Sequence, residues 1–113
     1  MLYFYNMSTG DDSDRVFKAL ASGSRRKMLD RLKTGPMTTG ALCDDFPELD
    51  RCTVMQHLSV LEDADLVIAQ RKGRERWNHL NPLPIRDLHD RWIAGYTTHA
   101  VDLLNRLKHG LEG

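Results

Sequence analysis

Residues Asp50–Asp63 have the sequence DRCTVMQHLSVLED, and the rest of the domain is organised around this segment. On a helical wheel it places Val54, Leu58 and Leu61 on one stripe, at spacings of four and three residues. The opposite side carries mid-sized side chains with hydrogen-bonding or soft apolar ends, namely Cys52, Met55, Gln56 and Ser59. A short helix with a firm apolar back and such a front is suited to insertion into the major groove of DNA.

Two short helices are predicted near the N-terminus. They span Asp14–Ala21 and Ser24–Lys33, and a serine of the Ser22-Gly23-Ser24 run can cap the second one. Gly35-Pro36 ends that helix. We expect the arginines after Ser24 to form a solvated face, and the buried side of the second helix to be Met28, Leu29 and Leu32.

A third helix is predicted between these two and the 50–63 segment. Thr38 or Thr39 caps it, and its apolar members are Ala41, Leu42, Cys43 and Phe46. Pro47 begins the turn that follows, and Asp50 is suited to cap the next helix.

After Leu66 the pattern changes from that of a helix to that of strands. Residues 67–70 (VIAQ) and 76–80 (RWNHL) are rich in strand formers, and 71–74 (RKGR) joins them with glycine at the bend. Asn81-Pro82-Leu83-Pro84 stops the second strand. The predicted hairpin is basic, because Glu75 is its one carboxylate against Arg71, Lys72, Arg74 and Arg76.

A long helix is predicted from Ile85 to about His109, with apolar residues at steps of three and four. It would be about 37 Å long, longer than so small a domain can cover, and would leave an apolar patch in a monomer. Pairing with a second copy through this helix and the first one would cover that patch. We expect a homodimer interface containing Phe17, Leu88, Trp92, Tyr96, Leu103 and Leu107. The alternative is a helix folded across its own domain.

A helix-turn-helix followed by a basic hairpin is the winged-helix arrangement. The expected fold is therefore mainly α with a small β-hairpin, in one winged helix-turn-helix domain at residues 14–109 that forms a homodimer through its first and last helices. Two reading helices related by a twofold axis predict an inverted-repeat operator in double-stranded DNA.

The expected roles in DNA binding follow from side-chain chemistry. Gln56 can hold adenine through two hydrogen bonds, Ser59 can bond to a base or a phosphate, and Cys52 and Met55 can touch thymine methyl groups. The candidates for contact with phosphates are Arg51, Thr53, His57, Arg71, Lys72, Arg74 and Arg76. For His57, half-buried packing is the alternative.

Four motifs resemble the ArsR-type (arsenic-repressor-like) winged-helix transcriptional regulators. They are LASGSRRKMLDRL at 20–32, TTGALCDDF at 38–46, TVMQHLSVLEDADLV at 53–67 and RKGRERWNHLNP at 71–82. The similarity covers residues 14–108, and NPLPIRDLHDRWI at 81–93 resembles the branch whose genes often neighbour START-type proteins. The resemblance implies a homodimer that represses by occupying its operator and that is released from DNA where a ligand binds.

The resemblance also raises the question of a sensed metal or oxidant. Arsenic-binding members use paired cysteines before the recognition helix, where this chain has only Cys43, too little for a soft thiolate site. Zinc-sensing members use last-helix ligands, and the counterparts here are Asp87, His89, His99 and Asp102. The gap between those histidines is one residue shorter than in the family, which turns the second ligand by about 100°.

We therefore expect no metal, and a zinc-responsive repressor remains an alternative. A regulatory disulfide between Cys43 and Cys52 is another, although it would require backbone movement. The sequence identifies no small-molecule inducer.

The composition is that of an ordinary globular protein of 113 residues, with 16 Lys and Arg against 16 Asp and Glu. Cationic contacts to DNA must therefore be local.

The two cysteines fit a reducing cytoplasm, and no apolar run is long enough to cross a membrane. We find no catalytic motif or phosphate-binding loop, and expect neither an enzyme nor a cofactor. A winged-helix adaptor that binds protein is the rival class, favoured by net neutrality and the acidic run at 62–65.

Residues 1–13 are expected to be an N-terminal arm. Its start, LYFY, is too short and lacks the basic lead of a signal peptide. We expect the natural chain to begin at Met7, with residues 1–6 lying upstream of it.

Overall fold

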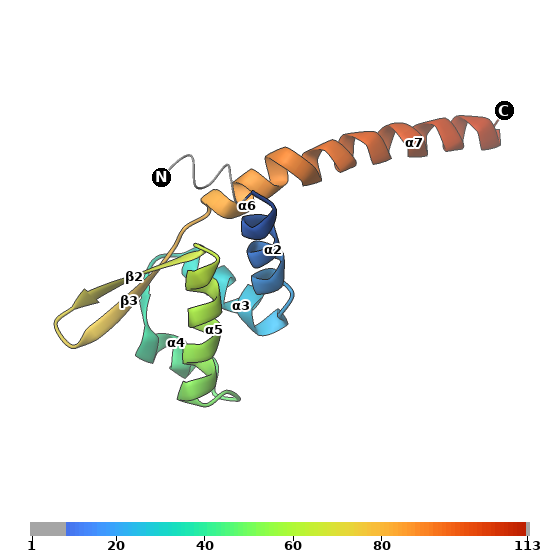
Figure 1. Ribbon diagram of the computed structural model, residues 1–113. Coiled ribbons are helices and arrows are strands. Elements are labelled where there is room, and N and C mark those ends of the chain that lie inside the picture. The colour runs from blue at the N-terminus through green and yellow to red at the C-terminus, as the bar shows by residue number, and fades with distance from the viewer. Residues whose placement is uncertain (1–8, 113) are drawn as a thin grey trace.

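In the part of the chain that the structure describes, four helices precede a two-stranded wing, and a long helix follows it (Figure 1). The computed structural model describes residues 9–112, and the side chains of 12–111 within that range. The elements in chain order are α2 (Thr9–Leu20), α3 (Gly23–Leu32), β1 (Met37–Thr38), α4 (Thr39–Asp45), α5 (Arg51–Asp63), β2 (Val67–Lys72), β3 (Glu75–Leu80), α6 (Leu83–Leu88), the π-helical η1 (His89–Ile93) and α7 (Ala94–Glu112). The prediction of a winged helix-turn-helix is confirmed.

The predicted helix starts are confirmed by their caps. The Ser22 hydroxyl accepts a hydrogen bond from the Arg25 backbone N–H at 3.3 Å, and the Thr38 hydroxyl accepts one from the Ala41 N–H at 3.1 Å. Each cap satisfies one of the backbone donors that a helix leaves unpaired at its start. These local signals place α3 and α4 within a residue or two of the expected bounds.

The wing is larger than predicted, and its sheet has a third strand. The strand order is β1-β3-β2, all antiparallel, and Lys72 pairs with Glu75, so the turn is only Gly73-Arg74. Gly73 has φ +63°, the left-handed conformation that a tight hairpin turn requires at that position. Strand β1 was not predicted, because two residues carry no periodicity and Met37 joins the sheet only by pairing with Asn78.

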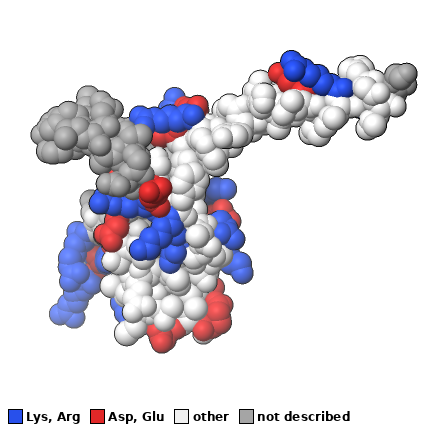
Figure 2. All heavy atoms as spheres, turned by 45° about the vertical axis from the view of Figure 1, so that its right-hand side comes forward, with Lys and Arg blue, Asp and Glu red and all other residues white. Residues whose placement is uncertain are grey.

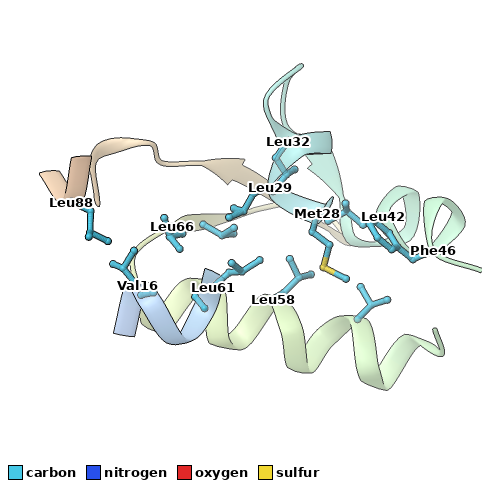
Figure 3. Packing of buried hydrophobic residues seen from close by; sticks show 14 residues of the cluster. Val16, Met28, Leu29, Leu32, Leu42, Phe46, Leu58, Leu61, Leu66 and Leu88 are labelled. Atoms are coloured by element: carbon cyan, nitrogen blue, oxygen red, sulfur yellow. The ribbon is translucent and has the colours of Figure 1, made fainter. Parts of the chain in front are cut away.

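The core lies between α5 and the helices α2, α3 and α4 (Figure 3). Val54, Leu58 and Leu61 of α5 are fully buried, which confirms the predicted apolar back of that helix. Met28 of α3 and Leu42 of α4 are equally buried against them. This packing fixes α5 from behind and leaves its opposite side to solvent.

The C-terminal end of α5 is closed by a compact hydrogen-bonded turn. The N–H of Leu66 donates to the carbonyl of Leu61 and that of Asp65 to Glu62, both at 2.9 Å, the pair of bonds of a Schellman motif. Asp65 has φ +60°, a conformation that glycine adopts more readily. Its carbonyl accepts a hydrogen bond from the Asn81 side chain at 2.9 Å.

The final helix is interrupted. Between α6 and α7 the five-residue segment η1 forms a π-helical turn, in which the Ala94 N–H donates to the His89 carbonyl. A π-turn adds one residue to the helix and offsets the residues after it by about 100°. Leu88, before the turn, is 7% exposed in the core, whereas Trp92 is 51% exposed. The single continuous stripe predicted through both residues is therefore wrong.

The expected start of the first helix also differs. Helix α2 begins at Thr9 and not at Asp14, so residues 9–13 of the expected arm are helical. Residues 1–6 lie outside the described part of the chain.

Helix α7 projects from the domain as a separate rod (Figure 1). Within residues 9–112, no helix combines the length and apolar character that a membrane span needs.

Candidate nucleic-acid interface

Asp50 fixes the start of the recognition helix α5. Its carboxylate accepts a hydrogen bond from the Thr53 backbone N–H at 2.7 Å, and this bond, with a second to the Thr53 hydroxyl, lowers the pKa of Asp50. The carboxylate is therefore ionised at neutral pH, and it caps a helix end that carries a partial positive charge. The cap holds the first turn, with Arg51 and Thr53, in a fixed orientation.

The front of α5 is open to solvent, as predicted. Cys52, Gln56 and Ser59 are exposed, and Met55 is 37% exposed. Arg51 is exposed at the start of the helix, and Thr53 is half-buried beside its cap. The predicted base-reading residues thus share one accessible face, and rigid packing lies behind it.

His57 is turned away from this front. Its Nδ1 lies 3.1 Å from the guanidinium of Arg25 and, since a guanidinium has no acceptor, His57 accepts that bond. Burial first, and then the charge of Arg25, lower the pKa of His57, so the ring is neutral at pH 7. His57 is half-buried, and the packing alternative fits it better than the phosphate role.

Arg25 is not part of a solvated face. It donates from Nε to the Ala19 carbonyl at 2.8 Å and from a terminal nitrogen to the Lys18 carbonyl at 2.9 Å. Arg26 donates to the Leu20 carbonyl at 2.6 Å. These carbonyls lie at the C-terminal end of α2, where the partial negative charge of the helix favours cations. Arg25 therefore joins the end of α2 to the recognition helix through His57.

Three of the four predicted wing cations are exposed to solvent. Arg71, Lys72 and Arg74 are exposed around the turn, and the Lys72 ammonium lies 5.9 Å from the ring centre of Trp77. Arg76 forms an ion pair with Glu62 near the end of α5 and is only 24% exposed. Arg76 is thus a link between wing and recognition helix, and its predicted role at phosphates is corrected.

Asn78 is a buried polar residue that the sequence analysis missed. Its side-chain amide donates to the Met37 carbonyl at 3.2 Å and to the Thr39 hydroxyl at 3.1 Å. It thereby fastens β3 to the start of α4. A polar residue in the middle of the predicted strand 76–80 was the only signal in the sequence, because its neighbour β1 was not predicted.

The residues expected at the dimer interface are exposed, with the exception of Leu88. Phe17 of α2 stacks edge-on against Trp92 with ring centres 5.4 Å apart, and Trp92 does the same with Tyr96 at 5.0 Å. Tyr96, Leu103 and Leu107 are exposed along α7. Figure 2 shows that α7 carries few charged side chains over much of its length. Leu88 packs inside its own subunit and is withdrawn from the interface.

The alternative sensor residues are not brought together in one subunit. Among the described residues, no three histidine, cysteine or acidic side chains are placed to hold a metal ion. Asp87 lies in α6, His89 in η1, and His99 and Asp102 on the projecting α7. Cys43 is half-buried and Cys52 exposed, and both are free thiols.

A reading helix packed against a three-helix core, with an exposed basic wing beside it, defines a DNA-binding protein of the winged helix-turn-helix class. Comparison with known proteins agrees. Residues 20–69 match a helix-turn-helix domain family. The chain is 39% identical to the HTH-type transcriptional regulator Rv2034 of Mycobacterium tuberculosis over 98 residues, which cover 83% of this chain and 91% of the relative. It is 35% identical to the transcriptional repressor SdpR of Bacillus subtilis over 74 residues, 66% of this chain and 81% of SdpR.

Solved structures give the same result. The crystal structure of the ArsR family transcriptional regulator RHA00566 matches with a TM-score of 0.71 and 28% identity, over 79% of this chain and 90% of that one. A homodimeric winged helix-turn-helix DNA-binding domain, Mb0332 from Mycobacterium bovis, matches with a TM-score of 0.65 and 25% identity, over 93% and 90%. The chain belongs to the ArsR-type helix-turn-helix transcriptional regulators and is a DNA-binding regulator.

Proposed function

We propose that the protein is a homodimeric repressor that occupies an inverted-repeat operator, with α5 in the major groove and the β2–β3 hairpin as its wing. The observation that carries this proposal is the two-sided character of α5. Its back is fully buried, whereas its front presents Gln56, Ser59, Met55 and Cys52 to solvent. Repression is supported by the likeness to SdpR, whose name describes a transcriptional repressor.

The wing supports a second set of contacts. Arg71, Lys72 and Arg74 lie around its turn, and the ion pair of Arg76 with Glu62 links the wing to the end of α5. In this arrangement the wing cations contact phosphates while α5 reads bases. Arg51 adds a phosphate contact at the start of the helix.

The proposed dimer is carried by α7. This helix has 19 residues, about 28 Å of length, and from Gly95 to Leu111 every side chain is exposed. Most helical stability in proteins comes from packing against other elements, which residues 95–111 lack within the subunit, and the exposed apolar residues of α7 would form a large patch. Covering it with α2 and α7 of a second copy removes both problems and places two copies of α5 on one side of the dimer.

Fluorescence anisotropy with a labelled duplex from the promoter of the protein's own gene tests the function. We expect saturable binding that resists competitor DNA, at two subunits per operator, and that weakens steeply with salt. The variant Gln56→Ala should show a reduced preference for operator over competitor, and the wing-base variant Ile68→Ala should keep the full preference. No binding at low salt, or equal affinity for every duplex, would refute the proposal.

A further inference from the structure

A cavity of about 270 Å³ lies where three elements meet: α2, the C-terminal end of α5, and the α6–η1 junction. Its inner wall is apolar and includes Val16, Ala64 and Leu88, all nearly inaccessible to solvent. The rings of Phe17 and Trp92, in contact with each other, form one side. A cavity of roughly 150 Å³ already holds a benzene molecule, so this one accommodates a body with one ring.

The polar groups around this apolar wall are mainly acidic. Asp12, Asp63, Asp65 and Asp87 line the cavity together with one cation, Arg91. Asp12 forms an ion pair with the exposed Arg15 at 3.9 Å. Asp63 and Asp65 make no ion pair within residues 12–111. The charge of the lining thus opposes an anion and favours a cation.

We infer that this cavity binds an organic cation: an ammonium or amidinium group carried on an apolar body of about one ring. The body fills the space between Val16, Leu88 and the Phe17–Trp92 pair, and the cation lies near Asp63 and Asp65 at the end of α5. A neutral ligand would leave Asp63 and Asp65 without a cationic partner. A purely hydrophilic cation would leave the apolar wall uncovered.

The position of the cavity gives its occupant an influence on DNA binding, a step that rests on the proposed function. Asp63 and Asp65 adjoin the last turn of the recognition helix, whereas Phe17 and Trp92 belong to the proposed dimer surface. A bound cation therefore touches both the reading helix and the elements that orient it in a dimer. Linkage requires the change in operator affinity caused by the cation to equal the change in cation affinity caused by the operator.

The binding test uses phenethylamine as the probe, with 2-phenylethanol and phenylacetate as neutral and anionic controls. The chain has two tryptophans, so Trp77→Phe leaves Trp92, at the cavity wall, as the sole reporter. We expect saturable fluorescence change with phenethylamine, about tenfold tighter than with the alcohol, and none with phenylacetate. The double variant Asp63→Asn/Asp65→Asn should erase the preference for the cation, because asparagine tolerates the left-handed conformation at 65. The matched control Asp30→Asn/Asp44→Asn should retain it.

Equal responses to the three probes, no saturation, or an unchanged preference in Asp63→Asn/Asp65→Asn would overturn the site. If that variant weakens the dimer in sedimentation while phenethylamine has no effect, a partner subunit fills the cavity and the inference is wrong. Operator affinity with and without phenethylamine forms a separate arm. No effect there overturns the regulatory step, whereas failure of the free protein to bind operator overturns the proposed function and leaves the fluorescence result intact.

Discussion

Replacing Trp92 by alanine should dissociate the proposed homodimer, and the structure sets the size of the effect. The side chain is 51% exposed in the subunit. A tryptophan buries up to about 250 Å², so about 125 Å² remains to be covered by a partner. At 25 cal/mol per Å² this corresponds to about 3 kcal/mol per subunit, and twofold symmetry applies it twice. Even with half that coverage, the loss of about 3 kcal/mol raises the dimer Kd roughly 100-fold.

Sedimentation equilibrium over a series of protein concentrations measures this Kd directly. Ile68→Ala is the matched control, because Ile68 is 55% exposed on the wing, away from α2 and α7. Trp92→Glu should dissociate the dimer more completely, since it would bury an unpaired charge. Circular dichroism melting checks that each variant still unfolds cooperatively. A Trp92→Ala Kd within twofold of wild type, with Ile68→Ala behaving identically, would refute the interface and the dimer built on it.

Three further predictions concern the reading helix and the wing. Gln56→Ala should weaken operator binding by about 1–3 kcal/mol and relax the preference at one base pair in a competition assay, because its side chain is exposed on the front of α5. Arg74→Ala should weaken binding to all duplexes alike and reduce the slope of log K against log salt by about 1, since the residue sits in the wing turn. His57→Gln should remove part of the acid sensitivity of the fold. Burial and the charge of Arg25 lower the pKa of His57 in the folded protein below the value of 6.5 for the unfolded chain. The free energy of unfolding therefore decreases as the pH falls through 6.5, and the loss is complete below the folded-state pKa.

A specific result would refute each of these predictions. A loss with Arg74→Ala that is confined to one sequence would assign that residue to base reading. For Gln56, unchanged discrimination at every base pair would remove it from the reading face. Urea titrations of wild type and His57→Gln at pH 7.5 and 5.5 should diverge only at the lower pH. Parallel curves would mean that the bond to Arg25 does not depend on His57 being neutral.

The parts of the fold that the sequence predicted well are those fixed by neighbours along the chain. The caps at Ser22, Thr38 and Asp50 and the apolar back of α5 all rest on spacings of three or four residues, and all were confirmed. The turn of the wing was placed too broadly, because Arg71 and Lys72 resemble turn residues although they pair with Arg76 and Glu75.

The roles of charged residues could not be predicted, because their partners lie far away in the sequence. Arg25 bonds to His57, 32 residues away, and Arg76 to Glu62, 14 residues away. A sequence pattern shows these arginines only as cations, whereas the fold makes one a helix cap and the other a link to the wing. The exposed front of α5 was predictable because it lies opposite the apolar stripe of Val54, Leu58 and Leu61, and the burial of that stripe follows from its spacing. Leu88 was misassigned because nothing local announces the π-turn that follows it.

In the proposed dimer, that π-turn sets the orientation of α7 relative to the DNA-binding domain. Helix α6 precedes the π-turn and is packed into the core of the DNA-binding domain through Leu88. Helix α7 follows the π-turn and forms the proposed dimer contact. Removing one residue between His89 and Ile93 would rotate α7 by about 100° relative to the DNA-binding domain. Twofold symmetry would repeat this rotation in the second subunit. The two copies of α5 in the proposed dimer would then no longer face successive major grooves on one side of the duplex. In the proposed dimer, the separation of the two half-sites therefore depends on this single turn, which lies outside the exposed front of α5.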